Sequence, residues 1–139
     1  MSSPSPIPSR PVRELMPSLR MSAEGMAAQM KFIEIISENI ANAQTTRTAD
    51  GTPYQRQVAV TGRDPETGEM VLRVAADPTP GRLVYDPGHP DANADGFVEY
   101  PNVEITHELV DLMVARRIHE ANATVFQAAK SMLRHALEI

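Results

Sequence analysis

The sequence lacks several residue types on which common protein functions depend. Its 139 residues contain no cysteine, which excludes a disulfide framework, a thiolate nucleophile and a cysteine-ligated metal. Tryptophan is also absent, and three phenylalanines and three tyrosines provide little bulk for a hydrophobic core within a single subunit. No apolar run approaches the roughly 18 residues of a membrane span, and the N-terminus lacks the apolar core of a secretory signal. We therefore expect no membrane insertion, and any export must use another route.

Positive charge is scarce as well. The formal net charge is −5, and nucleic-acid binding normally needs a clustered basic face, so we expect no nucleic-acid partner. Residues 47–102 hold most of the negative charge, with five arginines against nine acidic residues. The flanking segments are each close to neutral and can pack closely without long-range repulsion.

Proline is absent from residues 18–52 and 102–139, whereas the segment between them contains seven prolines. The first eighteen residues hold five prolines among serines, a composition that is expected to bury too little surface to fold. An alternative is that Met16 or Met21 is the true start. The predicted organisation is a disordered leader over 1–18, an N-terminal helix over 19–46, a β-rich middle segment over 47–102 and a C-terminal helix over 103–139.

Both predicted helices are amphipathic. Apolar residues recur at steps of three and four, the spacing of a coiled-coil-like seam. In the N-terminal helix the stripe is Leu19, Ala23, Met26, Met30, Ile33 and Ile40. In the C-terminal helix it is Val110, Val114, Ile118, Ala121, Val125, Ala128, Met132 and Ile139, with an adjoining stripe of Phe126, Ala129, Leu133 and Ala136.

The middle segment carries strand signals. Val58 and Val60 alternate with polar residues, a turn follows at 64–68, and Met70, Leu72 and Val74 alternate again, which predicts a β-hairpin. Shorter strands are expected at 83–85 and 97–100. The predicted fold class is α+β, with long terminal helices packed as a coiled-coil-like pair and a small β-hairpin-rich middle.

The C-terminal helix would be about 50 Å long at 1.5 Å per residue, too long for a short middle segment to cover. The N-terminal helix and neighbouring chains are therefore expected to cover much of its apolar surface. Eight methionines suit such adaptable contacts. The residues predicted to pack subunits together are Met26, Met30, Ile33, Ile40, Val114, Ile118, Ala121, Val125 and Met132. The alternative is a monomeric two-helix hairpin with a β cap.

The sequence contains only incomplete motifs for metal binding or catalysis. Asp91, Asn93, Asp95 and Gly96 resemble the opening of a calcium loop, but the twelfth position is Asn102 where a bidentate glutamate is needed. A soluble calcium- or ligand-binding module using the acidic loop 86–96 remains the alternative function. The four histidines lack metal-binding spacing, and no nucleophile elbow is present. Glu108 and Asp111 are interpreted as surface acids. We expect no cofactor and no enzyme, with an unrecognised hydrolase as a weaker option.

The end of the first helix holds the sharpest local feature. Asn39 and Asn42 lie three residues apart on one helix face, and their amides can bridge helices or fix the exit of the chain. A simple cluster of C-cap residues is the alternative. With Ala41 and Thr45, these residues form an Asn-x-Ala-Asn-x-x-Thr pattern.

This pattern resembles the signature of bacterial flagellar axial proteins, the rod, hook and hook-associated subunits. The segments 53–57, 85–92 and 96–103 strengthen the resemblance to rod proteins, which runs from about Leu19 to Ile139. It implies a structural subunit of the basal-body rod, exported by the flagellar type III apparatus without a cleaved signal. It also implies contacts with copies of itself and other rod proteins in a torque-transmitting shaft that crosses the periplasm.

Overall fold

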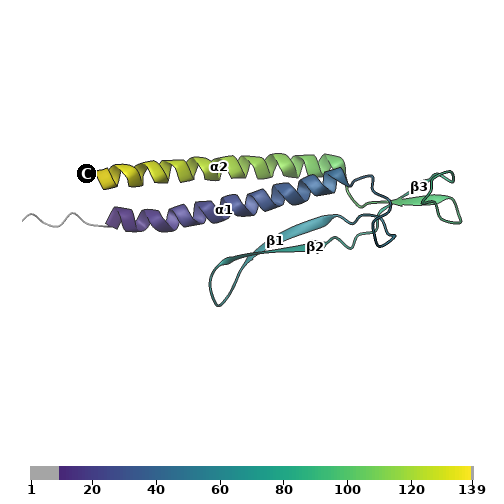
Figure 1. The fold of residues 1–139 in the computed structure, drawn as a ribbon, viewed down its shortest axis with the longest axis horizontal. Helices are drawn as coiled ribbons and strands as arrows, with labels where there is room; N and C mark the ends of the chain where they lie inside the picture. The colour runs from purple at the N-terminus through teal and green to yellow at the C-terminus, as the bar shows by residue number, and fades with distance from the viewer. Residues whose placement is uncertain (1–9, 139) are drawn as a thin grey trace, which may run out of the picture.

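The computed structural model describes residues 10–138 and shows two long helices side by side, with β-structure at one end (Figure 1). Its elements, in chain order, are α1 (Arg10–Ala41), β1 (Gln57–Arg63), β2 (Met70–Ala76), β3 (Arg82–Tyr85), β4 (Phe97–Tyr100) and α2 (Ile105–Glu138). The predicted α+β class, with packed terminal helices and a hairpin-rich middle, is confirmed.

The two helices are antiparallel. Asn39 near the end of α1 bonds to Glu108 near the start of α2, and Gly25 lies against Asn122 farther along both helices. Buried and half-buried residues recur every three or four positions along each contact face, the spacing of a coiled-coil seam. The seam consists of Ser22, Gly25, Gln29, Phe32, Ile36 and Asn39 on α1 and of Glu108, Leu112, Ala115, His119, Asn122, Phe126, Ala129 and Leu133 on α2.

Helix α1 begins at Arg10, nine residues before the predicted start, and contains Pro17. Residues 10–18, predicted to belong to a disordered leader, are therefore helical. Pro11 lies in the first turn, where its missing N–H is not needed, but Pro17 removes one helical hydrogen bond at a cost of about 3 kcal/mol. The last turns of α2 lie alongside this segment (Figure 1). The rest of the predicted leader, residues 1–9, lies outside the described residues.

Strands β1 and β2 form the predicted antiparallel hairpin. Its register differs from a simple one-sided amphipathic hairpin, because Val60 pairs with Arg73 while Leu72 pairs with Thr61. Directly paired residues share a face, so Val60 and Leu72 lie on opposite faces. Met70 and Leu72 line a space beside Ala28 of α1, whereas Val60 is 63% exposed. The hairpin therefore lies on α1 with one face and leaves apolar residues on the other.

Strands β3 and β4 form a second two-stranded sheet beyond the helix ends. Gly96 has a φ of 85°, and a Cβ there would lie 2.9 Å from the Tyr85 ring, so glycine suits this position on both counts. The ring of Tyr85 packs edge-on against Phe97.

The core is small. Its buried apolar residues among those described are Ala28, Ile35, Ala43, Val98, Ala115 and Ala129, mostly small side chains. Neither helix is long and apolar enough over residues 10–138 to cross a membrane.

Candidate assembly surface and polar junction

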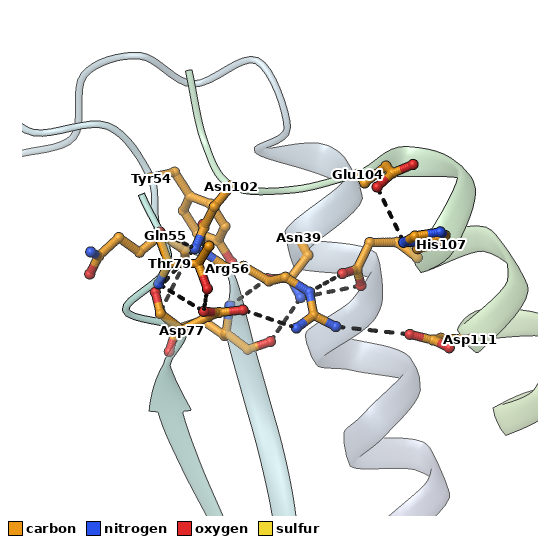
Figure 2. Close-up of polar contacts among 12 residues, drawn as sticks. Asn39, Tyr54, Gln55, Arg56, Asp77, Thr79, Asn102, Glu104, His107 and Asp111 are labelled. Atoms are coloured by element: carbon orange, nitrogen blue, oxygen red, sulfur yellow. Dashed lines mark hydrogen bonds and ion pairs between the residues drawn. The ribbon is translucent and has the colours of Figure 1, made fainter. Parts of the chain in front are cut away.

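A cluster of polar residues joins the two helices to the base of the β-structure (Figure 2). We call it the polar junction. It consists of Asn39, Tyr54, Arg56, Asp77, Asn102 and Glu108.

Asn39 lies at the centre of the polar junction and is 1% exposed. Its Nδ2 donates to the Gln57 carbonyl at 2.9 Å and to Glu108 at 3.4 Å. Its Oδ1 accepts from the Gln57 N–H at 2.9 Å and from the Tyr54 hydroxyl at 2.8 Å. These four bonds use the full capacity of one amide side chain. Asn39 thus links α1 to β1 and α2 at one point.

Arg56 forms the charged part of the polar junction. Its guanidinium bonds to Glu108, to Asp77 at 3.4 Å and to Asp111 at 3.9 Å. The bond to Glu108 raises the pKa of Arg56 above its ordinary value, against the opposing effect of burial. Glu108 is 1% exposed, so its interpretation as a surface acid was wrong. It occupies a seam position on α2, where only a partnered charge is tolerated.

Asn102 fastens the second β-sheet to this cluster. Its Oδ1 accepts from the backbone N–H of Arg56 at 2.7 Å, and its Nδ2 donates to the backbone carbonyls of Asp77 and Thr79 at 3.1 and 2.9 Å.

The Tyr54 hydroxyl has a raised pKa in this cluster. Burial is the main cause, followed by the negative charges of Glu38 and Glu108.

The other motif residues line the exit from α1. The Asn42 side chain donates to the Glu38 carbonyl at 2.9 Å and accepts from the Thr45 hydroxyl at 3.2 Å. The Thr45 carbonyl then accepts from the Tyr54 N–H at 3.0 Å, which brings the chain back towards the polar junction. Ala41 is exposed and is the last residue of α1.

The apolar stripe predicted on α2 lies beside the seam rather than in it. Its described members, which we call the outer stripe, are Val110, Val114, Ile118, Ala121, Val125, Ala128 and Met132, and Ile139 lies outside the described residues. Val114, Val125 and Met132 are 52%, 53% and 61% exposed. The adjoining stripe of Phe126, Ala129 and Leu133 instead packs in the seam. Helix α2 therefore carries two seam-like faces, of which its own chain covers one.

The predicted residues of α1 form a second partly uncovered face, which we call the α1 stripe. Met30 is 54% exposed, while Met26, Ile33 and Ile40 are half-buried. The structure does not bring the two stripes together. Outer-stripe residues other than Val110 precede seam residues by one position, whereas α1-stripe residues follow seam residues by one position. In an antiparallel helix pair, a residue just before the seam on one helix and a residue just after the seam on the other point to opposite sides of the pair. The outer stripe and the α1 stripe therefore lie on opposite sides.

Sequence comparison identifies the family of this arrangement. The segment 19–47 matches the model described as flagella basal body rod protein, and 94–139 matches flagellar basal body rod FlgEFG protein C-terminal. Flagellar basal-body rod protein FlgC of Borreliella burgdorferi is 37% identical, over 90% of this chain and 97% of the relative. The chain belongs to the FlgC family.

Further FlgC proteins are similar over nearly the same length. That of Bacillus subtilis is 36% identical over 88% of this chain and 95% of the relative, and that of Salmonella typhimurium is 35% identical over 86% and 92%. The chain is accordingly a structural subunit of the flagellar basal-body rod. The FlgC relatives are named as rod proteins rather than enzymes. The two family models cover most of the helix pair and the exit from α1.

The acidic loop 86–96 has a structural role in this FlgC chain. Asp91 accepts from the Thr46 hydroxyl at 2.6 Å and pairs with Arg47 at 2.8 Å, so its oxygens already bind protein groups. Asn93 accepts from the N–H groups of Asp95 and Phe97 and closes the turn. Across residues 10–138, no three acidic or histidine side chains gather as a metal site would require.

Sequence reasoning missed Arg56 and Glu108 as partners. The available signal was the position of Glu108, which lies four residues before Leu112 and seven before Ala115, at the spacing of the seam. A charged residue at such a position predicts a buried partner. The partner itself, 52 residues away, could not be named from sequence.

Proposed function

We propose that this FlgC subunit assembles into the axial drive shaft through the outer stripe of α2 and the α1 stripe. Its partners in this proposal are copies of itself and other rod proteins. The main support is the outer stripe itself, whose large apolar side chains recur at heptad spacing and are about half exposed. An uncovered seam of this kind favours association with another helix, because burying each large side chain contributes about 1.5–3 kcal/mol.

The arrangement of the two stripes supports an open-ended assembly. A contact between the outer stripe of one copy and the α1 stripe of the next is heterologous, since the two surfaces differ. Such contacts produce rings or helical filaments rather than closed twofold dimers. Interlocked helices also suit torque transmission, because twisting one subunit would separate many packed side chains at once.

The proposal includes where the subunit lies in the cell and how it is exported. The rod segment built from this subunit lies in the periplasm, and the flagellar type III apparatus exports the chain without a cleaved signal. Support for export comes from the small core of the subunit, because weakly packed helices need little work to unfold before they pass a narrow channel.

The substitution Val125→Asp tests the proposal in cells that lack the native gene. It places a charge in the outer stripe without touching the seam, so motility should be lost while the chain is still synthesised. Ser131→Asp is the matched control, because Ser131 is exposed and belongs to neither the seam nor the outer stripe. Normal swimming of the Val125→Asp strain would contradict the assignment of this surface.

A further inference from the structure

A narrow apolar groove runs between β1 and the part of the outer stripe nearest the polar junction. Its floor includes Ile35 and Ile36 of α1, one side includes Val114 and Ile118, and the other includes Val58 and Ala59. The groove has a volume of about 330 Å³. Ile118 is 41% exposed and Val114 52%, so the hairpin that lies alongside leaves both uncovered.

One wall of the groove is an open strand edge. At the two ends of the hairpin, Asp77 N–H donates to the Arg56 carbonyl at 2.8 Å and Asp64 N–H donates to the Glu69 carbonyl at 2.9 Å. Because hydrogen-bonding direction alternates along an antiparallel strand, Val58, Val60 and Gly62 bond to β2. Ala59 and Thr61 therefore direct their backbone groups outward, and within the described chain these groups have no hydrogen-bond partner.

An amide group already occupies the first position on this edge. Gln57 lies two residues before Ala59, so its N–H and C=O point to the same side of β1. Both are bonded by the Asn39 side chain, which accepts from the N–H and donates to the carbonyl, each at 2.9 Å. Asn39 therefore imitates the backbone of an adjacent strand and shows that the edge accepts amide partners.

We propose that the groove binds an extended segment of a neighbouring rod subunit, which adds to β1 as a third strand beyond Asn39. Strand addition supplies affinity through backbone hydrogen bonds and selectivity through alternate side chains. The preferred segment has apolar residues at every second position, which pack on the exposed side chains of Val114 and Ile118. A basic residue is favoured at the end near Asp111, which is 54% exposed and has only a 3.9 Å ion pair with Arg56.

This inference rests on the proposed function, since the partner is taken to be a subunit of the same rod. The probe is a peptide with blocked ends that copies residues 69–76. This segment has apolar Met70, Leu72 and Val74 at every second position and pairs with β1 in the hairpin. It is added in the millimolar range to isotope-labelled full-length chain, and amide hydrogen exchange is followed by NMR. The Ala59 and Thr61 amides should gain about tenfold protection, while the Val60 amide, already bonded within the hairpin, should change little.

Two variants locate the binding site. Ile118→Asp should weaken peptide binding about tenfold by removing one apolar wall. Ala59→Pro should also weaken it, because proline removes an outward N–H and leaves the bonds to β2 in place. A peptide methylated at alternate backbone nitrogens is the matched control probe and should give no protection.

The outcomes separate this inference from the proposed function. Absence of protection at Ala59 and Thr61, or protection confined to β2 through strand exchange, overturns it. Val125→Asp lies in the outer stripe beyond the groove, so that variant should bind the peptide as the unmodified chain does. Loss of motility in Val125→Asp without peptide binding to the unmodified chain would leave the assembly surface standing and reject the strand-addition site alone.

Discussion

The side-chain amide of Asn39 pairs with the backbone of Gln57 as a neighbouring β-strand would, with both hydrogen bonds at 2.9 Å. The same amide bonds Tyr54 and Glu108, so one buried side chain ties α1, β1 and α2 together. Asn39 therefore fixes the position of the hairpin on the helix pair, together with the ion pair between Arg56 and Glu108.

Replacement of Asn39 should destabilise the fold strongly. Asn39→Ala leaves the Gln57 backbone, the Tyr54 hydroxyl and one Glu108 oxygen short of a partner, and we expect a loss of about 2–4 kcal/mol in the free energy of unfolding. Urea denaturation followed by circular dichroism measures it. Asn42→Ala is the control, because Asn42 is half-buried and makes two side-chain bonds, and it should cost about 1 kcal/mol. Equal losses in the two variants would contradict a central role for Asn39.

At Gly25, two effects on stability oppose each other: helix propensity favours alanine, and the close approach of α2 favours glycine. Alanine gains about 1 kcal/mol over glycine inside a helix, but its Cβ would lie 2.8 Å from Nδ2 of Asn122. The obstacle is the flexible end of a side chain, so Gly25→Ala should change stability by less than about 1 kcal/mol. Gly25→Val adds two methyl groups and should lower the melting temperature, because the helices must separate locally. A more stable Gly25→Val variant would show that the seam does not need a small residue here.

Acid should loosen the contact between the loop 86–96 and the exit from α1. The hydroxyl of Thr46, followed by the guanidinium of Arg47, holds the pKa of Asp91 below its ordinary value. A lowered folded-state pKa gives stability that is present above the ordinary value, near 4, and is lost as the pH falls through the folded value. Asp91→Asn should therefore lose less stability than the unmodified chain between neutral pH and pH values below about 4. Asp95→Asn, which alters an exposed residue outside this contact, should behave like the unmodified chain.

If the outer stripe binds the α1 stripe, two variants that each damage one stripe should associate with each other when they are mixed. Val125→Asp damages the outer stripe, and Met30→Asp damages the α1 stripe on the opposite side of the helix pair. If outer and α1 stripes bind each other, neither variant should form long assemblies alone, but a mixture should yield heterodimers joined by one intact contact. Chemical cross-linking and sedimentation at high protein concentration distinguish these species. Assembly of Met30→Asp alone would show instead that the outer stripe binds a second outer stripe.

Hydrophobic periodicity was sufficient to predict two long helices, one hairpin and the α+β class. These elements repeat a local pattern, at steps of three and four in α1 and α2 and at steps of two in β1 and β2, and local pattern is readable without knowing the fold. The Asn39 motif likewise marked the end of α1 and the flagellar resemblance. The hairpin turn at 64–68 was also evident from residue type.

Tertiary structure decided which of two apolar stripes on α2 packs inside the subunit. Both have heptad spacing, and only the position of α1 separates the seam at Ala115 and Ala129 from the outer stripe at Val114 and Val125. Residues 10–18 are helical despite Pro17, which composition alone did not predict. Glu108 is buried because the fold brings Arg56 to it across 52 residues of chain. Sequence by itself thus determined the elements and the family, while the choice of faces and the pairing of buried charges depended on contacts between distant segments.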